Sequence, residues 1–230
     1  MHKLLLTTAA VAAAMAGAVA GETDFGTFTD TRDGQTYKTV NIDGQTWMAE
    51  NLNYKPPKGK SWRYYHDDTS YCNEHGRSGC NKYGRLYDWN TAKKVCPAGY
   101  HLPSRQEWNN LGRAVGGKRE QVGGVNYLGA GKKLKAKNGW DVSNGTDDYG
   151  FSALPGGWRH QHYNNIPDDA GDCDCGDNRG AGGFGNWWTA ASKDGEDAYQ
   201  LEMNYDNDDM YEYNSSKLAA FSVRCVADRP

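Results

Sequence analysis

Aliphatic side chains are scarce in this chain. Leu, Ile, Val and Phe together fall below the level of roughly 20% at which disorder is usually suspected. No segment beyond residue 20 is apolar enough to cross a membrane. The formal net charge is only −3, and nothing resembles the concentrated basic face that nucleic-acid binding requires. We therefore expect no transmembrane segment beyond residue 20 and no nucleic-acid partner.

The short motifs that mark common catalytic sites are also missing. The sequence has no Gly-x-Ser-x-Gly turn, no His-Glu-x-x-His pair and no phosphate-binding loop. Ser, His and Asp are frequent enough that chance groupings of them are expected. We assign no catalytic residues, and the sequence favours a binding or structural protein over an enzyme.

Aromatic residues and glycine are abundant instead. The chain has 8 Trp, 15 Tyr and 29 Gly. Aromatic rings bury large areas while their N–H and O–H groups find polar partners, and glycine permits tight turns. Together with the small net charge, this composition predicts a folded domain with an aromatic core rather than a disordered chain.

The first twenty residues have the pattern of a secretory signal peptide. Lys3 precedes an uncharged run over residues 4–20 that ends in Ala18-Val19-Ala20, so we expect cleavage after Ala20. The alternative, a membrane anchor, is disfavoured because the 17-residue run is short and rich in alanine. We expect a flexible leader at 21–31 and one domain at 32–230. The predicted location is secreted, extracellular or on the outer cell surface.

Two near-copies, DGQTY at 33–37 and DGQTW at 43–47, open the domain. Each Asp-Gly favours a tight turn, and the Thr and aromatic residues after it favour strands. Residues 36–40 and 46–48 are therefore predicted to form a β-hairpin.

Helical periodicity is limited to the middle of the chain. Apolar spacing predicts a first helix over 85–95, which Pro97 stops. Ser104 and Glu107 form a capping box that starts a second helix, with Trp108, Leu111 and Val115 on its buried side. Short strands are expected at 149–154, 186–190, 199–205, 210–213 and 220–226. An acidic, Gly-rich stretch at 167–185 reads as a functional or mobile segment.

Several aromatic residues are candidate ligand-binding residues. Trp158 follows a Pro-Gly-Gly turn, and Tyr163, Tyr211 and Tyr213 lie beside polar segments. Tyr211 and Tyr213 share one face of their strand. In the pair Trp187-Trp188, by contrast, we expect at least one ring to point into the core, because neighbouring strand residues alternate between faces.

Two groups of residues are candidate metal sites. Asp206, Asp208 and Asp209, with Asn204 and Asn207, could supply oxygen ligands to calcium, although the spacing is not that of an EF-hand and a solvated acidic turn is the alternative. His160 and His162 alternate on a strand-like segment and could share a transition metal with nearby Asp and Cys residues. No cofactor is assigned; calcium is a candidate.

Five stretches carry a resemblance to a known family. They are KYGRLY at 82–87, WNTAKKVCPAGYHLPS at 89–104, GKKLK at 131–135, GTDDYGFSALPGG at 145–157 and FSVRCV at 221–226. Together they resemble the Fibrobacter succinogenes major paralogous domain family, from about residue 28 to residue 226. That family is similar to the group with the C-type-lectin-like fold, which includes the formylglycine-generating enzymes.

The resemblance implies an α+β fold of one C-type-lectin-like domain. In that fold the terminal strands pair, two helices flank a small twisted antiparallel sheet, and long loops form the working surface. It also implies a disulfide between Cys96 and Cys225. Six cysteines allow 15 pairings, which the sequence alone does not distinguish. Cys72 and Cys80 are the natural local pair, and Cys173 and Cys175 either bridge each other or stay reduced.

Three functions follow as expectations. The preferred one is a bacterial binding or adhesion module for carbohydrate or another surface ligand, with residues 158–185 and 204–214 as its contact surface. Cellulose-degrading relatives make plant polysaccharide an attractive ligand. The first alternative is an oxidoreductase related to the formylglycine-generating enzymes, which requires free Cys173 and Cys175. The second is a structural surface component.

Overall fold

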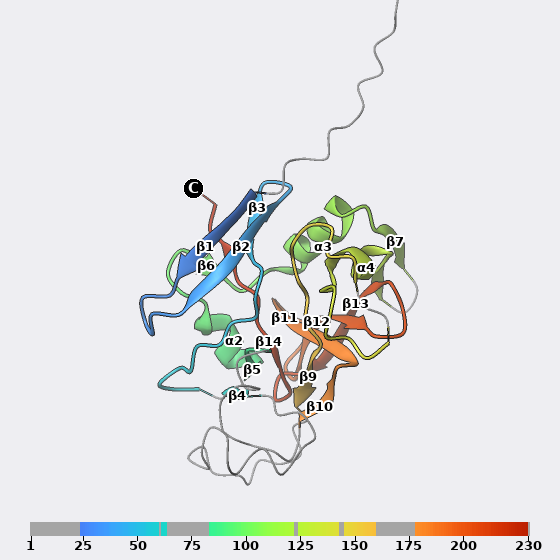
Figure 1. Cartoon of the computed structure of the whole chain (residues 1–230). Helices are drawn as coiled ribbons and strands as arrows, with labels where there is room; N and C mark the ends of the chain where they lie inside the picture. The colour runs from blue at the N-terminus through green and yellow to red at the C-terminus, as the bar shows by residue number, and fades with distance from the viewer. Residues whose placement is uncertain are drawn as a thin grey trace, which may run out of the picture.

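The computed structural model describes residues 24–59, 61–63, 83–121, 124–142, 145–159 and 178–229. Over these residues the chain forms an α+β fold with two sheets and short helices. Figure 1 shows the smaller sheet beside the first helix, with the larger sheet crossing the rest of the domain.

The smaller sheet brings the two ends of the described chain together. Its strands are β1 (Asp24–Thr29), β2 (Thr36–Ile42), β3 (Gln45–Met48), β15 (Val226–Ala227) and β6 (Tyr100–His101), in that order across the sheet. β15, at the C-terminal end, pairs with both β3 and β6. The N-terminal and C-terminal strands thus belong to one sheet, although they do not pair directly.

The predicted hairpin at 36–48 is confirmed. β2 and β3 pair antiparallel from Thr39 opposite Met48 to Ile42 opposite Gln45. Asp43 and Gly44, at the turn, have φ of 53° and 75°. Positive φ at both central residues matches the type I′ turn, whose twist suits a two-residue hairpin.

The flexible leader expected at 21–31 instead contains a strand at residues 24–29. Residues 24–29 form β1, which pairs along its whole length with β2. Most of β1 is exposed, so backbone hydrogen bonding to β2 holds it more than burial does. The Phe28 ring also lies 4.6 Å from that of Tyr100. The sequence did not indicate this strand, because its small polar residues lack the apolar alternation of a half-buried strand.

The larger sheet is built from later parts of the chain. Its strands are β4 (Ser61–Arg63), β5 (Arg85–Asp88), β7 (Lys118–Gln121), β8 (Val125–Leu128), β9 (Gly156–Arg159), β10 (Asn178–Ala181), β11 (Phe184–Ser192), β12 (Asp197–Asn204), β13 (Met210–Ser216) and β14 (Ala220–Ser222). Across the sheet they run β4-β5-β14-β9-β11-β12-β13-β8-β7, with β10 paired to β9.

Four of the five later strand predictions are confirmed with shifted ends, and the one at 149–154 is wrong. Gly150 and Ser152 have φ of 67° and 51°, which interrupts an extended strand. The Asp147 carboxylate holds this turn, because it accepts hydrogen bonds from the backbone N–H of Ser152 at 2.7 Å and from its hydroxyl at 2.6 Å. Within 149–154, Ala153 is the only residue that forms a β-bridge, and its partner is Lys135.

The helix predicted over 85–95 is four residues shorter than expected. Residues 85–88 form β5, and helix α2 covers Trp89–Val95. Asp88 ends the strand and caps the helix, accepting a hydrogen bond from Thr91 N at 2.8 Å. All four residues of β5 are buried between β4 and β14, and this tertiary pairing overrides the helical spacing of the segment.

The other helices are α3 (Arg105–Ala114) and α4 (Ala130–Leu134). The predicted capping box of α3 is confirmed, with Ser104 accepting from Glu107 N and the Glu107 side chain accepting from Ser104 N. Trp108, Leu111 and Val115 are buried as expected. None of the helices in the described ranges is both long and apolar enough to span a bilayer.

The core lies on both faces of the larger sheet. Trp187 and Trp188, adjacent on β11, are both completely buried. Trp187 packs in a cluster with Trp108 and Phe151, whereas Trp188 packs in a second cluster with Phe221 and Tyr87. The alternation of strand side chains therefore places one indole on each face, and the prediction that at least one ring is buried is confirmed.

A disulfide joins the end of the first helix to the last strands. Cys96 and Cys225 have their Cα atoms 5.9 Å apart and are separated by 129 positions, which confirms the expected pairing. Cys72, Cys80, Cys173 and Cys175 lie outside the described residues, as does the predicted signal peptide.

Candidate functional site

A pocket of about 240 Å³ opens on one face of the larger sheet. Strands β9, β11, β12 and β13 and the start of β14 supply its walls. Its lining combines aromatic, amide, hydroxyl and charged groups: Trp158, Arg159, Asn186, Gln200, Glu202, Ser215, Ser216, Ala219 and Phe221. Ligand sites typically pair an apolar wall with a few polar groups in this way.

Strand register places the polar residues of this pocket in one row. Glu202 on β12 lies opposite Asn186 on β11 and opposite Tyr211 on β13. Gln200 lies opposite Trp188 and Tyr213. Residues directly opposite in a sheet share a face, so these side chains are on the same side. We call the surface bearing Trp158, Asn186, Gln200, Glu202, Tyr211 and Tyr213 the Glu202 face.

The floor of the pocket is a buried hydrogen-bonded group. Asn186 donates through Nδ2 to Glu202 Oε2 at 2.9 Å and to Gln200 Oε1 at 3.3 Å. Asn186 is 2% exposed and Gln200 is 3% exposed. Two acceptors around Nδ2 fix the orientation of the amide. Asn186 Oδ1 is then buried without a hydrogen-bond partner among the described residues.

Burial is the main influence on the Glu202 carboxyl, and it raises its pKa. Hydrogen bonds from Asn186, Asn204 and Gln200 lower the pKa in part, and the negative charge of Asp206 raises it further. The described contacts contain no ion pair between Glu202 and a basic side chain. The carboxylate is therefore stabilised by amides rather than by a cation.

Trp158 is an aromatic residue of the pocket lining, and Tyr211 and Tyr213 lie on the neighbouring strand, opposite Glu202 and Gln200. The Trp158 and Phe184 rings meet edge to face with centroids 5.1 Å apart. On β13, the Tyr211 and Tyr213 rings are within 13° of parallel, with centroids 5.9 Å apart, and Tyr213 is 42% exposed. Burial and the neighbouring Asp209 raise the pKa of Tyr211 to about 12. Burial and the charge of Glu202 raise the pKa of Tyr213.

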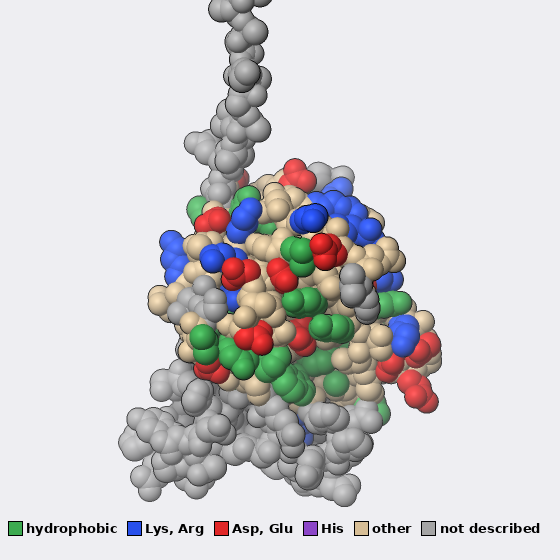
Figure 2. Space-filling model, turned by 90° about the vertical axis from the view of Figure 1, so that its right-hand side faces the viewer, with side chains coloured by type: hydrophobic (Ala, Val, Ile, Leu, Met, Phe, Trp, Pro, Cys, Tyr) green, Lys and Arg blue, Asp and Glu red, His purple; other side chains and the backbone are tan. Residues whose placement is uncertain are grey.

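Figure 2 shows that hydrophobic and acidic side chains lie close together on the surface of this protein. Hydrophobic side chains, a class that includes Tyr and Trp there, gather across the lower part of the described surface, and Asp and Glu side chains lie directly beside them. Most Lys and Arg side chains in that view lie toward the upper part. Hydrophobic and acidic side chains thus adjoin without basic groups between them over part of the surface in that view.

The structure brings together three of the four aromatic residues proposed as ligand-binding. Trp158, Tyr211 and Tyr213 lie on the Glu202 face, and Tyr163 is outside the described residues. They sit on strands β9 and β13 rather than on the long loops that the resemblance implied. The segments expected to form the contact surface, 158–185 and 204–214, thus contain parts of strands β9, β10 and β13 within their described residues.

Asn186, Gln200 and Glu202 are members of this site that the sequence interpretation missed. The signal that could have found two of them is the alternation in AYQLEMN over 198–204, where Gln200 and Glu202 share a face opposite Leu201 and Met203. Polar residues on a strand face are ordinarily solvent-facing, so the pattern does not show that Gln200 is buried or that Glu202 lines a pocket.

The acidic group proposed for calcium is engaged in other contacts. Asp208 pairs with Lys132 at 3.2 Å, and Asp209 accepts from Gly129 N at 2.8 Å and from the Tyr211 hydroxyl at 3.1 Å. Asp206 accepts from the Asn207 amide. In the parts of the chain that the structure describes, no group of three or more His, Cys, Asp or Glu is placed to hold a metal ion. His160 and His162 are outside those parts.

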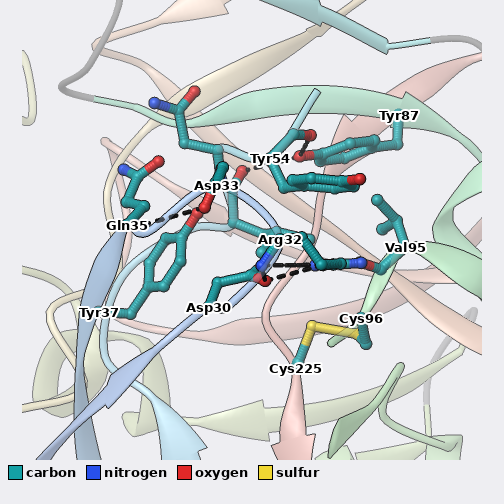
Figure 3. A network of polar contacts seen from close by, with 12 residues as sticks. Asp30, Arg32, Asp33, Gln35, Tyr37, Tyr54, Tyr87, Val95, Cys96 and Cys225 are labelled. Carbon is teal, nitrogen blue, oxygen red and sulfur yellow. Dashed lines mark hydrogen bonds and ion pairs between the residues drawn. A yellow bond between two sulfur atoms is a disulfide. The ribbon is translucent and has the colours of Figure 1, made fainter. Parts of the chain in front are cut away.

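A second pocket, of about 490 Å³, lies beside the smaller sheet, and Arg32 and Tyr54 are part of its wall. Figure 3 shows Arg32 between Asp30, Tyr54 and the carbonyl of Val95, close to the Cys96–Cys225 disulfide. Its guanidinium donates to Asp30 at 2.6 and 2.8 Å and to Val95 O at 2.8 Å, and lies 3.8 Å from the Tyr54 ring centroid. Burial acts against the charged form of Asp30, but the hydrogen bonds from Arg32 lower its pKa. Arg32 therefore ties the β1–β2 turn to α2, and we place the functional site at the Glu202 face.

The model of the Fibrobacter succinogenes major domain matches residues 40–227, which include the larger sheet, part of the smaller sheet, the disulfide and the Glu202 face. The chain belongs to this family. No curated protein and no solved structure matches it. The match covers most of the chain and agrees with the resemblance found in the sequence.

Proposed function

We propose that this Fibrobacter succinogenes major domain is an exported binding module that holds a carbohydrate or similar polar surface ligand on the Glu202 face. The observation that carries the proposal is the convergence of Trp158, Tyr211 and Tyr213 on the face where Asn186 and Glu202 form a buried polar floor. Sugar rings present both apolar C–H faces and hydroxyl donors. Aromatic walls complement the first, and amide and carboxylate oxygens complement the second.

We further propose a lectin-like arrangement and export to the cell surface. Strands from both chain ends in one sheet, and the disulfide that closes the domain, support the arrangement. A disulfide between distant residues is typical of proteins that fold in an oxidising compartment, which agrees with the secretory pattern of residues 1–20.

The test is binding of the purified chain to cellulose, xylan, chitin and deacetylated chitin, measured by depletion from solution. We expect at least one of these to retain the protein. Tyr213→Ala and Trp158→Ala are expected to weaken that binding at least about tenfold, as loss of an aromatic anchor does.

Phe25→Ala is the matched control, because Phe25 is an aromatic residue 65% exposed on β1 of the other sheet. It is expected to leave binding unchanged. Retention that is equal in all three variants would place the ligand elsewhere on the molecule, and no retention of the parent chain by any of the polysaccharides would count against the proposed function.

A further inference from the structure

The Glu202 pocket presents hydrogen-bond acceptors to its interior. Both donor hydrogens of the Asn186 amide are directed to Gln200 and Glu202, which line the pocket with it. The ionised Glu202 carboxyl can only accept hydrogen bonds, and its side chain is partly exposed in the pocket. The pocket therefore selects for a ligand group that donates hydrogen bonds.

The charge that acts most directly on Glu202 is negative. Asp206 raises the pKa of this carboxyl by repulsion. Arg159 on β9 lines the same pocket and makes contacts of its own, and the described ion pairs include none between its guanidinium and Glu202. Tyr211 and Tyr213, on the same face, are neutral at physiological pH as tyrosines ordinarily are, and their pKa values are raised further. A partly buried carboxylate without a cation is costly, and a cationic ligand group would reduce that cost.

Aromatic faces next to the carboxylate complete the pattern. Trp158 lines the pocket, Tyr213 is cross-strand from Gln200, and Tyr211 is cross-strand from Glu202. Ring faces attract ammonium groups through their quadrupole, most strongly where water is partly excluded. A carboxylate that accepts hydrogen bonds and aromatic faces beside it are groups that recognise an ammonium.

We infer that the Glu202 pocket binds a protonated amino group, and that the preferred ligand is an amino sugar with a free amine. This inference rests on the proposed function and narrows its ligand class. Glu202 accepts hydrogen bonds from the ammonium, and Trp158 and the two tyrosines contact the sugar ring around it. An N-acetylated sugar lacks the positive charge and is the natural comparison, because it differs from the amine at a single group.

The experiment measures the affinity of the full chain for a glucosamine tetramer and for its fully N-acetylated counterpart by isothermal titration calorimetry. We expect the amine to bind about tenfold more tightly, a difference of about 1.4 kcal/mol. As the pH is lowered, the amine stays protonated while Glu202 becomes neutral. The affinity for the amine is therefore expected to fall at a pH above the usual titration range of an exposed glutamate, because the pKa of Glu202 is raised.

Glu202→Gln keeps the shape of the side chain and removes its charge, and it is expected to bring the two affinities to within about twofold. Glu196→Gln, at an exposed position on the β11–β12 turn, is the matched control and is expected to keep the preference. Tyr213→Leu is a second variant, at a half-exposed position, that is expected to weaken binding of the amine more than that of the acetylated tetramer.

Equal binding of the two tetramers, or a preference that survives in Glu202→Gln, would overturn the inference while leaving carbohydrate binding on this face intact. If neither tetramer binds, the inference fails as well. The proposed function then depends on whether the polysaccharides retain the chain through Trp158 and Tyr213, so the two failures are distinguished.

Discussion

Arg224 lies completely buried at the centre of the domain. Its guanidinium donates to Asn51 Oδ1 at 2.9 Å, to Ser152 O at 2.7 Å and to Phe151 O, and it lies 4.4 Å from the Phe151 ring centroid. Burial lowers the pKa of Arg224 to about 9, because the charged form loses its hydration in the core. Asn51 also accepts from the Trp187 indole at 2.9 Å. The FSVRCV motif thus joins the last strands to two loops and the core.

Replacing Arg224 by alanine is expected to lower the free energy of unfolding by about 3 kcal/mol or more. The variant leaves the carbonyl groups of Phe151 and Ser152 without this donor, and Asn51 Oδ1 keeps only the Trp187 indole. Chemical denaturation of the parent and of the variant measures the difference. Arg224→Lys keeps the charge but reaches fewer of these acceptors, so an intermediate loss is expected. A loss below about 1 kcal/mol in Arg224→Ala would contradict this role.

At the scale of single residues, the sequence predicted the aromatic candidates but not the polar ones. Trp158, Tyr211 and Tyr213 were selected because of their type and their neighbours. Arg224 and Asn51 are separated by 173 positions in the sequence. The Asn186–Glu202 contact likewise depends on strand pairing. Local spacing does not show such contacts, because they form only after the sheet is assembled.

Helix α3 is the element that the sequence predicted best, and α2 shows why others were missed. The capping box at Ser104 is a local pattern, so it can be recognised in the sequence without knowledge of the fold. The helical spacing of 85–95 is also local, but β5 forms there because both of its neighbours offer strand edges. Propensity decides an element only where tertiary pairing does not compete with it.

His101 links two elements of the smaller sheet and α3. Its Nδ1 lies 2.6 Å from Asp228 Oδ1, and its Nε2 lies 2.9 Å from Glu107 Oε1, so the C-terminal segment is joined to the capping box of α3. Partial burial acts against the charged imidazole, but the hydrogen bonds to Asp228 and Glu107 raise the pKa of His101 overall. The protonated form is thus favoured in the folded state.

The contribution of His101 to stability is expected to depend on pH. Because its folded-state pKa is raised, the stabilisation is fully present below the unfolded-state pKa and is lost as the pH rises through the folded-state pKa. His101→Gln should therefore cost more stability at pH 5.5 than at pH 9, by about 0.5 kcal/mol, the size of an exposed ion pair. Denaturant unfolding at both pH values measures this. The same cost at the two pH values would show that the charge of His101 is unimportant.

At the scale of the whole molecule, the Cys96–Cys225 disulfide and a two-sided sheet hold the described part of the domain together. The Cys96–Cys225 disulfide closes a loop with a separation of 129 positions. The larger sheet carries a buried cluster on each face, with Trp187 in one and Trp188 in the other. The Glu202 face is the part of that sheet which remains accessible beside the second cluster.

Removing the disulfide by the double substitution Cys96→Ser and Cys225→Ser is expected to lower the free energy of unfolding by roughly 4–5 kcal/mol, from the loop-closure entropy of the unfolded chain. Guanidinium denaturation of the parent chain and of the double variant tests this. Peptide mapping without reductant checks the pairing itself, and a dominant peptide joining Cys96 to another cysteine would contradict it.

The order of the strands could not be predicted from the sequence. β14 pairs with β5 and β9, and β11 pairs parallel with both β9 and β14, although these strands come from distant parts of the chain. The two predicted features that reached across the molecule were the disulfide, which is confirmed, and the pairing of the terminal strands, which instead share one sheet without pairing directly. Both came from the resemblance to the family, whereas composition and periodicity revealed only local structure.

The most direct test of the Glu202 face is a nuclear magnetic resonance titration of the ¹⁵N-labelled chain with the glucosamine tetramer and with a cello-oligosaccharide. The account predicts that the largest shift changes occur in the Trp158 indole N–H and in the amide signals of Asn186, Glu202 and Tyr213, with β1 and β2 unaffected. Changes centred on Arg32 and Tyr54, or no changes with either sugar, would contradict it.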